Sequence, residues 1–397
     1  MPHELVEAGG LQLDDAIALR RRLHRRPELG LQLPQTQAAI LESLDGLPLT
    51  VTTGTTTSSV VAVLEGDREG PTMLLRGDMD ALPMPEDVDL PFKSEIDGAM
   101  HACGHDAHVA MLAGSAHVLS GMRKDIAGRV VFMFQPGEEG FHGARYMIEE
   151  GLLTDPATKP DAAFAIHQTA MIPSGMVVTK GGAMMASADV LRIVVHARGG
   201  HASMPHQTCD PIPIAAEIVL AIQSMITRRI DIFNPAVVTV AKITSGTTNN
   251  VIPETAELLG TIRAVSARTR TEVHDNLKRV AENIAAAHGA TAEVTIEVGY
   301  PVTVNDDGWA TRSLAVAEAT LGEGKTIVSP TPVMGAEDFS YVLEEVPGAM
   351  VFLGTMPSDF PVEPNHSNRM VIDESAMAAG ISLYSAIALD FCKVSGD

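Results

Sequence analysis

The sequence predicts an α/β fold in which a three-layer α/β domain is interrupted by a smaller inserted domain. Two observations lead to this expectation. Towards both ends of the chain, short apolar runs alternate with helical patterns, which is typical of layered α/β domains. In the middle, strand and helix patterns follow the order β-α-β-β-α-β, which is the ferredoxin-like order. We therefore expect residues 1–182 and 300–397 to form the outer domain and residues 183–299 to form the insert.

The outer domain begins with helical patterns at 13–26 and 37–44, and Pro27 helps to end the first of them. A further helix is expected at 107–120, and an amphipathic helix at about 374–393 closes the chain. The strands expected beside these helices are apolar and β-branched, and lie at 59–64, 72–76 and 129–134.

The insert opens with the alternation of a half-buried strand at 190–196. A long helix is expected at 211–229. Ser266 is a suitable N-cap for a second helix that runs to about His288, where Gly289 is the expected stop. The other strand patterns of the insert lie at 236–242, 256–263 and 291–298.

The chain is strongly acidic, with 28 Lys and Arg against 50 Asp and Glu and a formal net charge of −22. Such a surface repels phosphate backbones and anionic membranes, so we expect neither nucleic acid nor a membrane as partner. No apolar run approaches the ~20 residues that span a bilayer, and the first residues do not resemble a signal peptide. The three cysteines are too few and too scattered for a disulfide framework, which favours a cytoplasmic location.

The densest group of reactive side chains is HACGHDAH at 101–108. Cys103 and His105 are two residues apart in what reads as a turn before a helix, and Gly104 gives that turn its backbone freedom. A thiolate and an imidazole together bind borderline transition metals. The alternative is a structural thiol among satisfied histidines, and these residues alone do not decide between the two. His108, on the helix, is more typical of a packed residue behind a site.

The segment QPGEEG at 135–140 directly follows a strand that looks buried on both faces. Loops at the carboxyl ends of such strands are where α/β domains place ligands. Neighbours on an extended loop point opposite ways, so one of Glu138 and Glu139 is suited to bind a metal while the other accepts a proton from water. The plain alternative is a solvated acidic turn.

Two more histidines complete a candidate ligand set. His167 ends the apolar segment 162–167, and His366 lies in a polar loop. Taken alone, His167 is more typical of a structural residue, and His366 is equally a plain surface residue. With Cys103, His105 and Glu139 they make five candidate ligands, which is more than a tetrahedral structural zinc site needs and enough for two metals.

Seven motifs occur in order along the chain: RGDMDALP at 76–83, HACGHD at 101–106, QPGEEG at 135–140, GGHAS at 199–203, NVIP at 250–253, GAEDF at 335–339 and NHS at 365–367. With this set the sequence resembles the M20 metallopeptidase family over nearly the whole chain. Within the family it is most similar to the branch of hippurate hydrolases, N-acyl-amino-acid amidohydrolases and indole-acetyl-amino-acid hydrolases.

The resemblance implies a binuclear centre of two divalent metal ions, held by Cys103, His105, Glu139, His167 and His366. It implies Glu138 as base and acid, and Asp80 as a carboxylate that orients a ligand histidine. Asp78 stands where the wider family usually has His; the amidohydrolase branch has Asp there and uses the Cys-Gly-His ligands instead. Because of this departure we expect manganese, with zinc, cobalt and nickel left open.

The resemblance also implies that the insert is a lid and dimerisation module, which gives a homodimer or a tetramer. His201 is expected to donate a hydrogen bond to the developing oxyanion, in its own cleft or the partner subunit's. Asn250 and Arg263 are expected to bind the substrate carboxylate, since a guanidinium matches a carboxylate in a bidentate manner. Taken alone, His201 is equally a loop residue and Arg263 a surface charge.

The expected function is metal-dependent hydrolysis of N-acyl amino acids to a carboxylic acid and a free amino acid. An aminopeptidase or dipeptidase is the main alternative. A thiol-dependent hydrolase built on Cys103 and a non-catalytic binding protein are the others. Nothing in the sequence indicates the acyl group.

Overall fold

A computed structural model describes residues 2–393 and divides the chain into two compact units. The unit in which the metal centre is expected, which we call the catalytic unit, comprises the chain up to Met184, Val304–Thr331 and the chain from Asp338 onward. The inserted unit comprises Met185–Thr303 and the short segment Pro332–Glu337. Each unit has its own hydrophobic cluster, as independently packed domains do. The predicted fold class, a layered α/β domain with an insert, is confirmed.

The catalytic unit is built on an eight-stranded sheet in the order β1-β2-β4-β3-β5-β16-β6-β15. Its strands are β1 (Leu49–Thr53), β2 (Val60–Glu65), β3 (Arg68–Asp78), β4 (Ala127–Gln135), β5 (Ala162–Thr169), β6 (Val177–Thr179), β15 (Thr326–Val328) and β16 (Gly348–Gly354). The four central strands, β4, β3, β5 and β16, are parallel. β4, β5 and β16 are almost entirely buried, as is β3 from Thr72 onward, which is the pattern of a parallel sheet covered on both faces.

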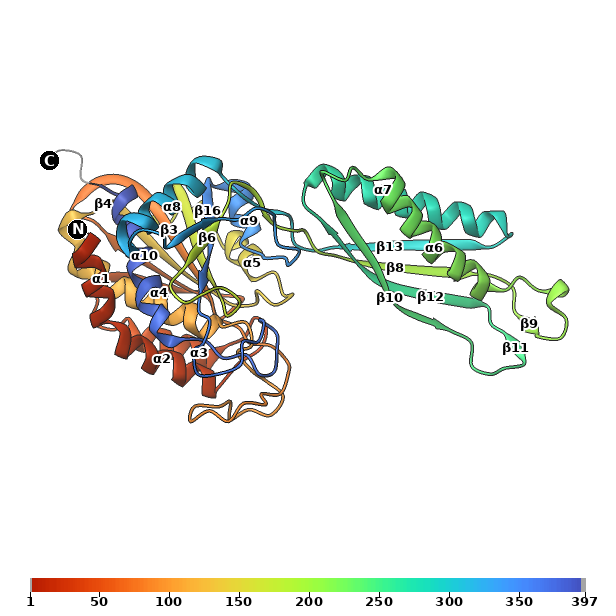
Figure 1. The fold of residues 1–397 in the computed structure, drawn as a ribbon, viewed down its shortest axis with the longest axis horizontal. Helices are drawn as coiled ribbons and strands as arrows, with labels where there is room; N and C mark the ends of the chain where they lie inside the picture. The colour runs from red at the N-terminus through yellow and green to blue at the C-terminus, as the bar shows by residue number, and fades with distance from the viewer. Residues whose placement is uncertain (1, 394–397) are drawn as a thin grey trace. The chain divides into compact units, whose positions relative to one another are not determined.

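Helices surround this sheet (Figure 1). They are α1 (Pro2–Leu11), α2 (Leu13–Arg25), α3 (Pro34–Ser43), α4 (His105–Gly121), α5 (Gly143–Glu149), α8 (Asp307–Leu321), α9 (Ser340–Glu345) and α10 (Met377–Phe391), with short 3-10 turns at Arg123–Asp125 and Glu374–Ala376. α4 packs against α2, α10 and β3, while α5 packs against α9 and β4. The buried helix α4 thus brings the Cys-Gly-His segment to the centre of the unit.

The inserted unit is a four-stranded antiparallel sheet in the order β10-β12-β8-β13 with two helices packed against it. In chain order its elements are β8 (Asp189–His196), α6 (Pro211–Arg229), β10 (Ala236–Ser245), β12 (Thr255–Ala264), α7 (Ala267–Ala287) and β13 (Thr291–Val298). This is the predicted β-α-β-β-α-β order, and each element lies within a few residues of its predicted position. Ser266 caps α7 as predicted, because its side chain accepts a hydrogen bond from the Thr269 backbone.

Small elements complete the chain: β7 (Gly182–Met185), β9 (Gly200–His201), β11 (Val251–Ile252), β14 (Thr303–Asn305) and a 3-10 turn at Pro205–Gln207. β9 pairs with β11 and β7 with β14. Among the described residues, one helix, α6, has the length and composition that could cross a membrane, with 19 residues. One face of α6 packs into the inserted unit, since Ile214, Ile218 and Ile222 are buried in its hydrophobic cluster.

Candidate metal centre

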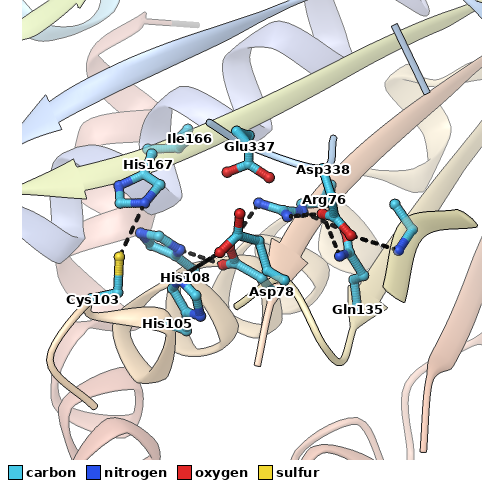
Figure 2. Close-up of polar contacts among 12 residues, drawn as sticks. Arg76, Asp78, Cys103, His105, His108, Gln135, Ile166, His167, Glu337 and Asp338 are labelled. Carbon is cyan, nitrogen blue, oxygen red and sulfur yellow. Dashed lines mark hydrogen bonds and ion pairs between the residues drawn. The ribbon is translucent and has the colours of Figure 1, made fainter. Parts of the chain in front are cut away.

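The candidate ligands of the catalytic unit gather where neighbouring parallel strands end. β3 ends at Asp78, β4 at Gln135 and β5 just beyond His167. Because these strands are adjacent and parallel, their carboxyl ends lie at one edge, where α/β sheets bind ligands. Figure 2 shows Asp78, Gln135 and His167 facing this edge together with Cys103 and His105 from the start of α4.

The turn that carries Cys103 and His105 depends on Gly104. Gly104 is the N-cap of α4 and has a φ of 81°, in the left-handed region that side chains disfavour. α4 begins at His105, two residues earlier than predicted, so Cys103 lies in the expected turn and His105 is the first residue of the helix. Cys103 Sγ lies 3.5 Å from His167 Nε2, so the structure brings together two residues far apart in the sequence.

The rings of His105 and His167 are held in the same tautomer. His105 Nδ1 is 2.9 Å from the backbone oxygen of Asp80, and His167 Nδ1 is 2.6 Å from that of Gln168. A carbonyl oxygen only accepts, so Nδ1 carries the proton in both rings. Each Nε2 therefore presents its lone pair to the site, which is the arrangement of metal-binding histidines.

Glu138 and Glu139 are anchored by Asp80. The carboxylate of Asp80 accepts the backbone N–H of Glu138 at 2.9 Å and that of Glu139 at 3.0 Å. The Asp80 carboxylate also lies beside the ligand histidine, since its Oδ1 is 3.6 Å from His105 Nδ1, while the Asp80 backbone oxygen makes the shorter contact at 2.9 Å.

The two glutamate side chains do not point opposite ways, contrary to the expectation for an extended loop. Glu138 Oε2 and Glu139 Oε1 lie 4.0 Å and 3.9 Å from the same atom, His105 Nε2. Left-handed conformations at Gly137 and Gly140 bend the loop and bring both carboxylates to one side.

His366 approaches the cluster from a distant loop. Its Nε2 is 3.3 Å from Glu139 Oε1, and its backbone N–H donates to the Ala102 oxygen at 2.8 Å, beside Cys103. Its φ of 67° is unusual for a residue other than glycine, and such conformations concentrate at functional sites. All five predicted ligands therefore lie in one region of the catalytic unit.

The donor set suits two divalent transition metals. The ligand atoms of Cys103, His105 and His167 lie within 4.8 Å of one another, as do those of Cys103, Glu139 and His366. The two groups share Cys103, as expected for two adjacent ions with a common ligand. His105 Nε2 and Glu139 Oε1 are buried, and each has a side chain of opposite charge type 3.3 Å away, Asp78 and His366 respectively. Neither atom has a well-aligned hydrogen bond within the described part of the chain, and buried polar atoms need a partner. Sulfur and imidazole donors favour transition metals over Mg²⁺ or Ca²⁺.

The electrostatics favour the thiolate form of Cys103. Burial opposes the charged thiolate, but the imidazoles of His167 and His105 hold the pKa of Cys103 well below its usual range. Hydrogen bonding to Cys103 and Glu139 raises the pKa of His366 to about 10. Burial, together with the Cys103 charge, raises the pKa of Glu139. A thiolate is required both of a metal ligand and of a nucleophile, so this property alone does not separate the two hypotheses.

Behind the ligands lies a fully buried set of charges that the sequence analysis did not assign. Arg76 donates to Asp78 at 2.8 Å, to Gln135 at 2.8 Å and to Asp338 at 3.1 Å (Figure 2). Asp78 also bonds to His108, which confirms the interpretation of His108 as a residue behind the site. An arginine that directly follows two buried leucines in β3 is the signal that could have revealed this network, because a buried charge needs partners.

Within the inserted unit, His201 and Asn250 lie together. β9 pairs with β11 so that His201 faces Val251, and the Asn250 carbonyl accepts the Ala202 N–H at 3.1 Å. The Ser203 N–H donates to His201 Nδ1 at 3.1 Å. Nδ1 is therefore an acceptor, so the proton of the neutral ring is on Nε2.

Arg263 lies at the opposite end of β12. Thr255, close to β11, pairs with His196, whereas Ile262 pairs with Asp189. At ~3.3 Å per residue, roughly 25 Å separates the two ends of this strand. Arg263 is half-buried, and burial lowers its pKa in spite of nearby Asp189. In a single chain the structure does not bring Arg263 close to His201 and Asn250.

Comparisons with known proteins identify the family to which the chain belongs. The model of peptidase family M20/M25/M40 matches residues 74–390. Thermostable carboxypeptidase 2 of Saccharolobus solfataricus is 40% identical over 383 residues, which cover 95% of each chain. N-acetylcysteine deacetylase of Bacillus subtilis is 36% identical and is matched over 96% of its length by 94% of this chain.

The solved structures include the YXEP protein of Bacillus subtilis, described as a dinuclear metal binding peptidase of the M20 family. It superposes with a TM-score of 0.84 at 32% identity, covering 96% of this chain and 98% of its own. The resemblance found in the sequence is thereby confirmed. The chain belongs to peptidase family M20 and is a metal-dependent hydrolase of its amidohydrolase branch.

Proposed function

We propose that this enzyme hydrolyses the amide bond of N-acyl amino acids and releases a carboxylic acid and a free amino acid. Its two ions are held by Cys103, His105, Glu139, His167 and His366. The observation that carries the proposal is the environment of the two glutamates. Glu139 Oε1 lies between His105 and His366, whereas Glu138 Oε2 lies at the edge of the same cluster, 4.0 Å from His105 Nε2. Glu139 is thus suited to bind metal and Glu138 to handle protons.

Divalent ions bound there supply Lewis acidity, which polarises an amide carbonyl and lowers the pKa of a water molecule. Glu138 takes the proton from that water and returns it to the leaving nitrogen, which is general base and then general acid catalysis. The carboxylate of Asp80 keeps Glu138 in place by accepting the backbone N–H of Glu138. Because Glu138 is only 6% exposed, few other water molecules compete for its carboxylate.

The inserted unit contributes the remaining polar groups in this proposal. The Nε2–H of His201 donates to the oxyanion that develops on the carbonyl, and its tautomer supports that role. Asn250 and Arg263 bind the substrate carboxylate. Since they lie at opposite ends of β12 in one chain, we propose that His201 and Asn250 serve the cleft of the partner subunit while Arg263 serves its own.

A homodimer formed through the inserted unit follows from this arrangement. β10 is an edge strand of the four-stranded sheet, and a second copy that pairs along it would extend the sheet. Apolar side chains on α6 and β10 support this interface, since Leu220 is 73% and Ile243 is 56% exposed.

Manganese is the proposed native metal, and the unpaired thiols of Cys103, Cys209 and Cys392 support a reducing, cytoplasmic location. The deacetylase relative supports an N-acyl amino acid substrate, and the carboxypeptidase relative supports a second candidate, the removal of C-terminal residues from blocked peptides. Both reactions need a free carboxylate, which distinguishes them from an aminopeptidase.

The test is release of free amino acid from N-acetyl, N-benzoyl, indole-acetyl and long-chain N-acyl amino acids, with blocked peptides and free dipeptides alongside. Each assay is run on chelated enzyme and on enzyme restored with Mn²⁺ or Zn²⁺. We expect cleavage of acylated substrates only after metal is restored. Activity that survives chelation would identify a thiol enzyme, and cleavage of free dipeptides alone would identify an aminopeptidase or dipeptidase.

A further inference from the structure

Gln168, which follows His167 in β5, is completely buried and hydrogen-bonded through both ends of its side chain. Its Nε2 donates to the backbone oxygen of Cys103 at 2.6 Å, and its Oε1 accepts from the Thr355 hydroxyl at 2.7 Å. The opposite orientation of the amide would set Oε1 against the Cys103 oxygen, where two acceptors would repel each other. The side chain therefore forms a directional link from Thr355 to the Cys103 turn.

The backbone of Gln168 extends this link to the other candidate ligands. Its oxygen accepts from His167 Nδ1 at 2.6 Å and from Asn365, the neighbour of His366, at 3.3 Å. Its N–H donates to His108 Nε2 at 2.8 Å. Three chain segments that carry ligands thus meet at one residue.

The side chain also limits the space around the turn between Cys103 and His105. A Cβ on Gly104 would collide with the amide of Gln168, whose Cδ would be 2.6 Å away. The Gln168 amide therefore packs directly on the left-handed turn and holds the Cys103 carbonyl from the same side. Apart from Gln168, the Cys103 oxygen has a longer contact, 3.4 Å, with the Asn365 amide.

We propose that Gln168 is a positioning residue of the metal centre. Its side-chain amide fixes the turn so that Cys103 Sγ and His105 Nε2 converge before an ion arrives, which raises metal affinity. The inference rests on the proposed metal binding by these residues. Partners behind metal ligands contribute in this way, and their replacement typically weakens metal binding about 10–100-fold.

The test compares Gln168→Met with Asn305→Leu. Methionine keeps the volume of Gln168 and removes both side-chain hydrogen bonds. Asn305 is a matched control, since it is an equally buried amide that bonds to Thr179, Lys180 and Met350 rather than to a ligand segment. Dissociation constants for Mn²⁺ and Co²⁺ are measured by calorimetry on metal-free protein, with the cobalt–thiolate absorption band as a signature of Cys103. Melting temperatures report the structural cost of each variant.

We expect Gln168→Met to weaken binding of both ions about 10–100-fold and to change the thiolate band, while Asn305→Leu lowers the melting temperature and leaves metal affinity unchanged. Gln168→Met within threefold of the wild type, or an equal loss of affinity in both variants, overturns the inference. A wild type that binds neither ion overturns the proposed function as well.

Thr355→Val provides a second variant should Gln168→Met not fold. It removes the hydroxyl that orients Oε1 and leaves the backbone hydrogen bonds of Gln168 intact. We expect metal binding weaker than in the wild type, with a smaller loss than Gln168→Met should cause. Where Gln168→Met does fold, adding Thr355→Val to it should cause no further loss. Unchanged affinity in Thr355→Val overturns the proposed link.

Discussion

Glu138 and Glu139 are neighbours in the chain with the same side chain, yet their surroundings differ. Glu139 lies between two imidazoles, at 3.9 Å from His105 and 3.3 Å from His366. Glu138 Oε2 lies 4.0 Å from the first of these. A ligand needs close donors around it, whereas a proton acceptor needs access to the reacting water, so the roles of the two residues should separate in mutants.

Glu138→Gln is expected to retain both metal ions and to lower kcat by roughly 10²–10⁴-fold, because glutamine keeps the shape of the side chain but takes up no proton. Metal content is measured by elemental analysis and turnover on the best N-acyl amino acid. Glu149→Gln, an exposed glutamate in α5, is the control and should match the wild type. A variant that keeps a sizeable fraction of turnover would show that the base lies elsewhere.

Among individual residues, the sequence could identify those whose side-chain type is itself typical of metal binding or catalysis. Cys103, His105, His167 and His366 were candidates because few other side chains bind transition metals. Gln168 and Arg76 were not, since their importance depends on partners such as Thr355 and Asp338, which are distant in the chain and leave no local pattern. Asp80 could be predicted as a supporting residue, but the sequence does not show which of its groups contacts which partner. In the structure its carbonyl accepts from His105 and its carboxylate accepts from Glu138.

Among the helices and strands, the long periodic segments of the insert were predicted well, whereas several elements of the outer domain were not assigned, among them α8 and, at the start of the chain, α1. Gly9 and Gly10 lower the helix propensity of this segment, so composition argues against a helix there. Packing overrides propensity, because α1 lies against α10 and Gly9 is buried in that contact. A side chain at Gly9 would collide with Ser382 and would come within 2.7 Å of the Ala378 oxygen.

This packing predicts opposite effects for two adjacent glycines. Gly9→Ala should lower the free energy of unfolding by about 1–3 kcal/mol, because it overpacks the contact between the helices. Gly10→Ala has no atom within 4 Å of the added carbon and should raise it by roughly 0.5–1 kcal/mol through helix propensity. Urea unfolding followed by circular dichroism measures both. Changes of the same sign in the two variants would contradict the contact.

For the molecule as a whole, the separation of Arg263 from His201 along β12 predicts that a complete site needs two chains. His201→Ala and Glu138→Gln should each be nearly inactive. A mixed dimer, however, contains one cleft in which an intact Glu138 meets an intact His201 from the other chain. Random exchange should therefore restore about a quarter of the wild-type activity.

The measurement mixes the two variants, allows subunits to exchange and follows turnover with time. A mixture of Glu138→Gln with wild type controls for exchange itself. Mixed dimers that form and stay inactive would place His201 in the cleft of its own chain.

The interruption of the catalytic unit also bears on the order in which the protein acquires structure during synthesis. β16 lies beside β5 in the central sheet, yet the whole inserted unit is made between them. The strands of the insert pair with strands that are close in sequence, so the insert can begin to fold soon after it has been synthesised. The sheet edge that carries His167 must wait for a strand that leaves the ribosome much later, because domains fold as units once their parts are present. Until then Phe164 and Ile166, core residues of the finished enzyme, lack the neighbour that covers them, so nascent chains paused before residue 348 should be the ones that chaperones capture.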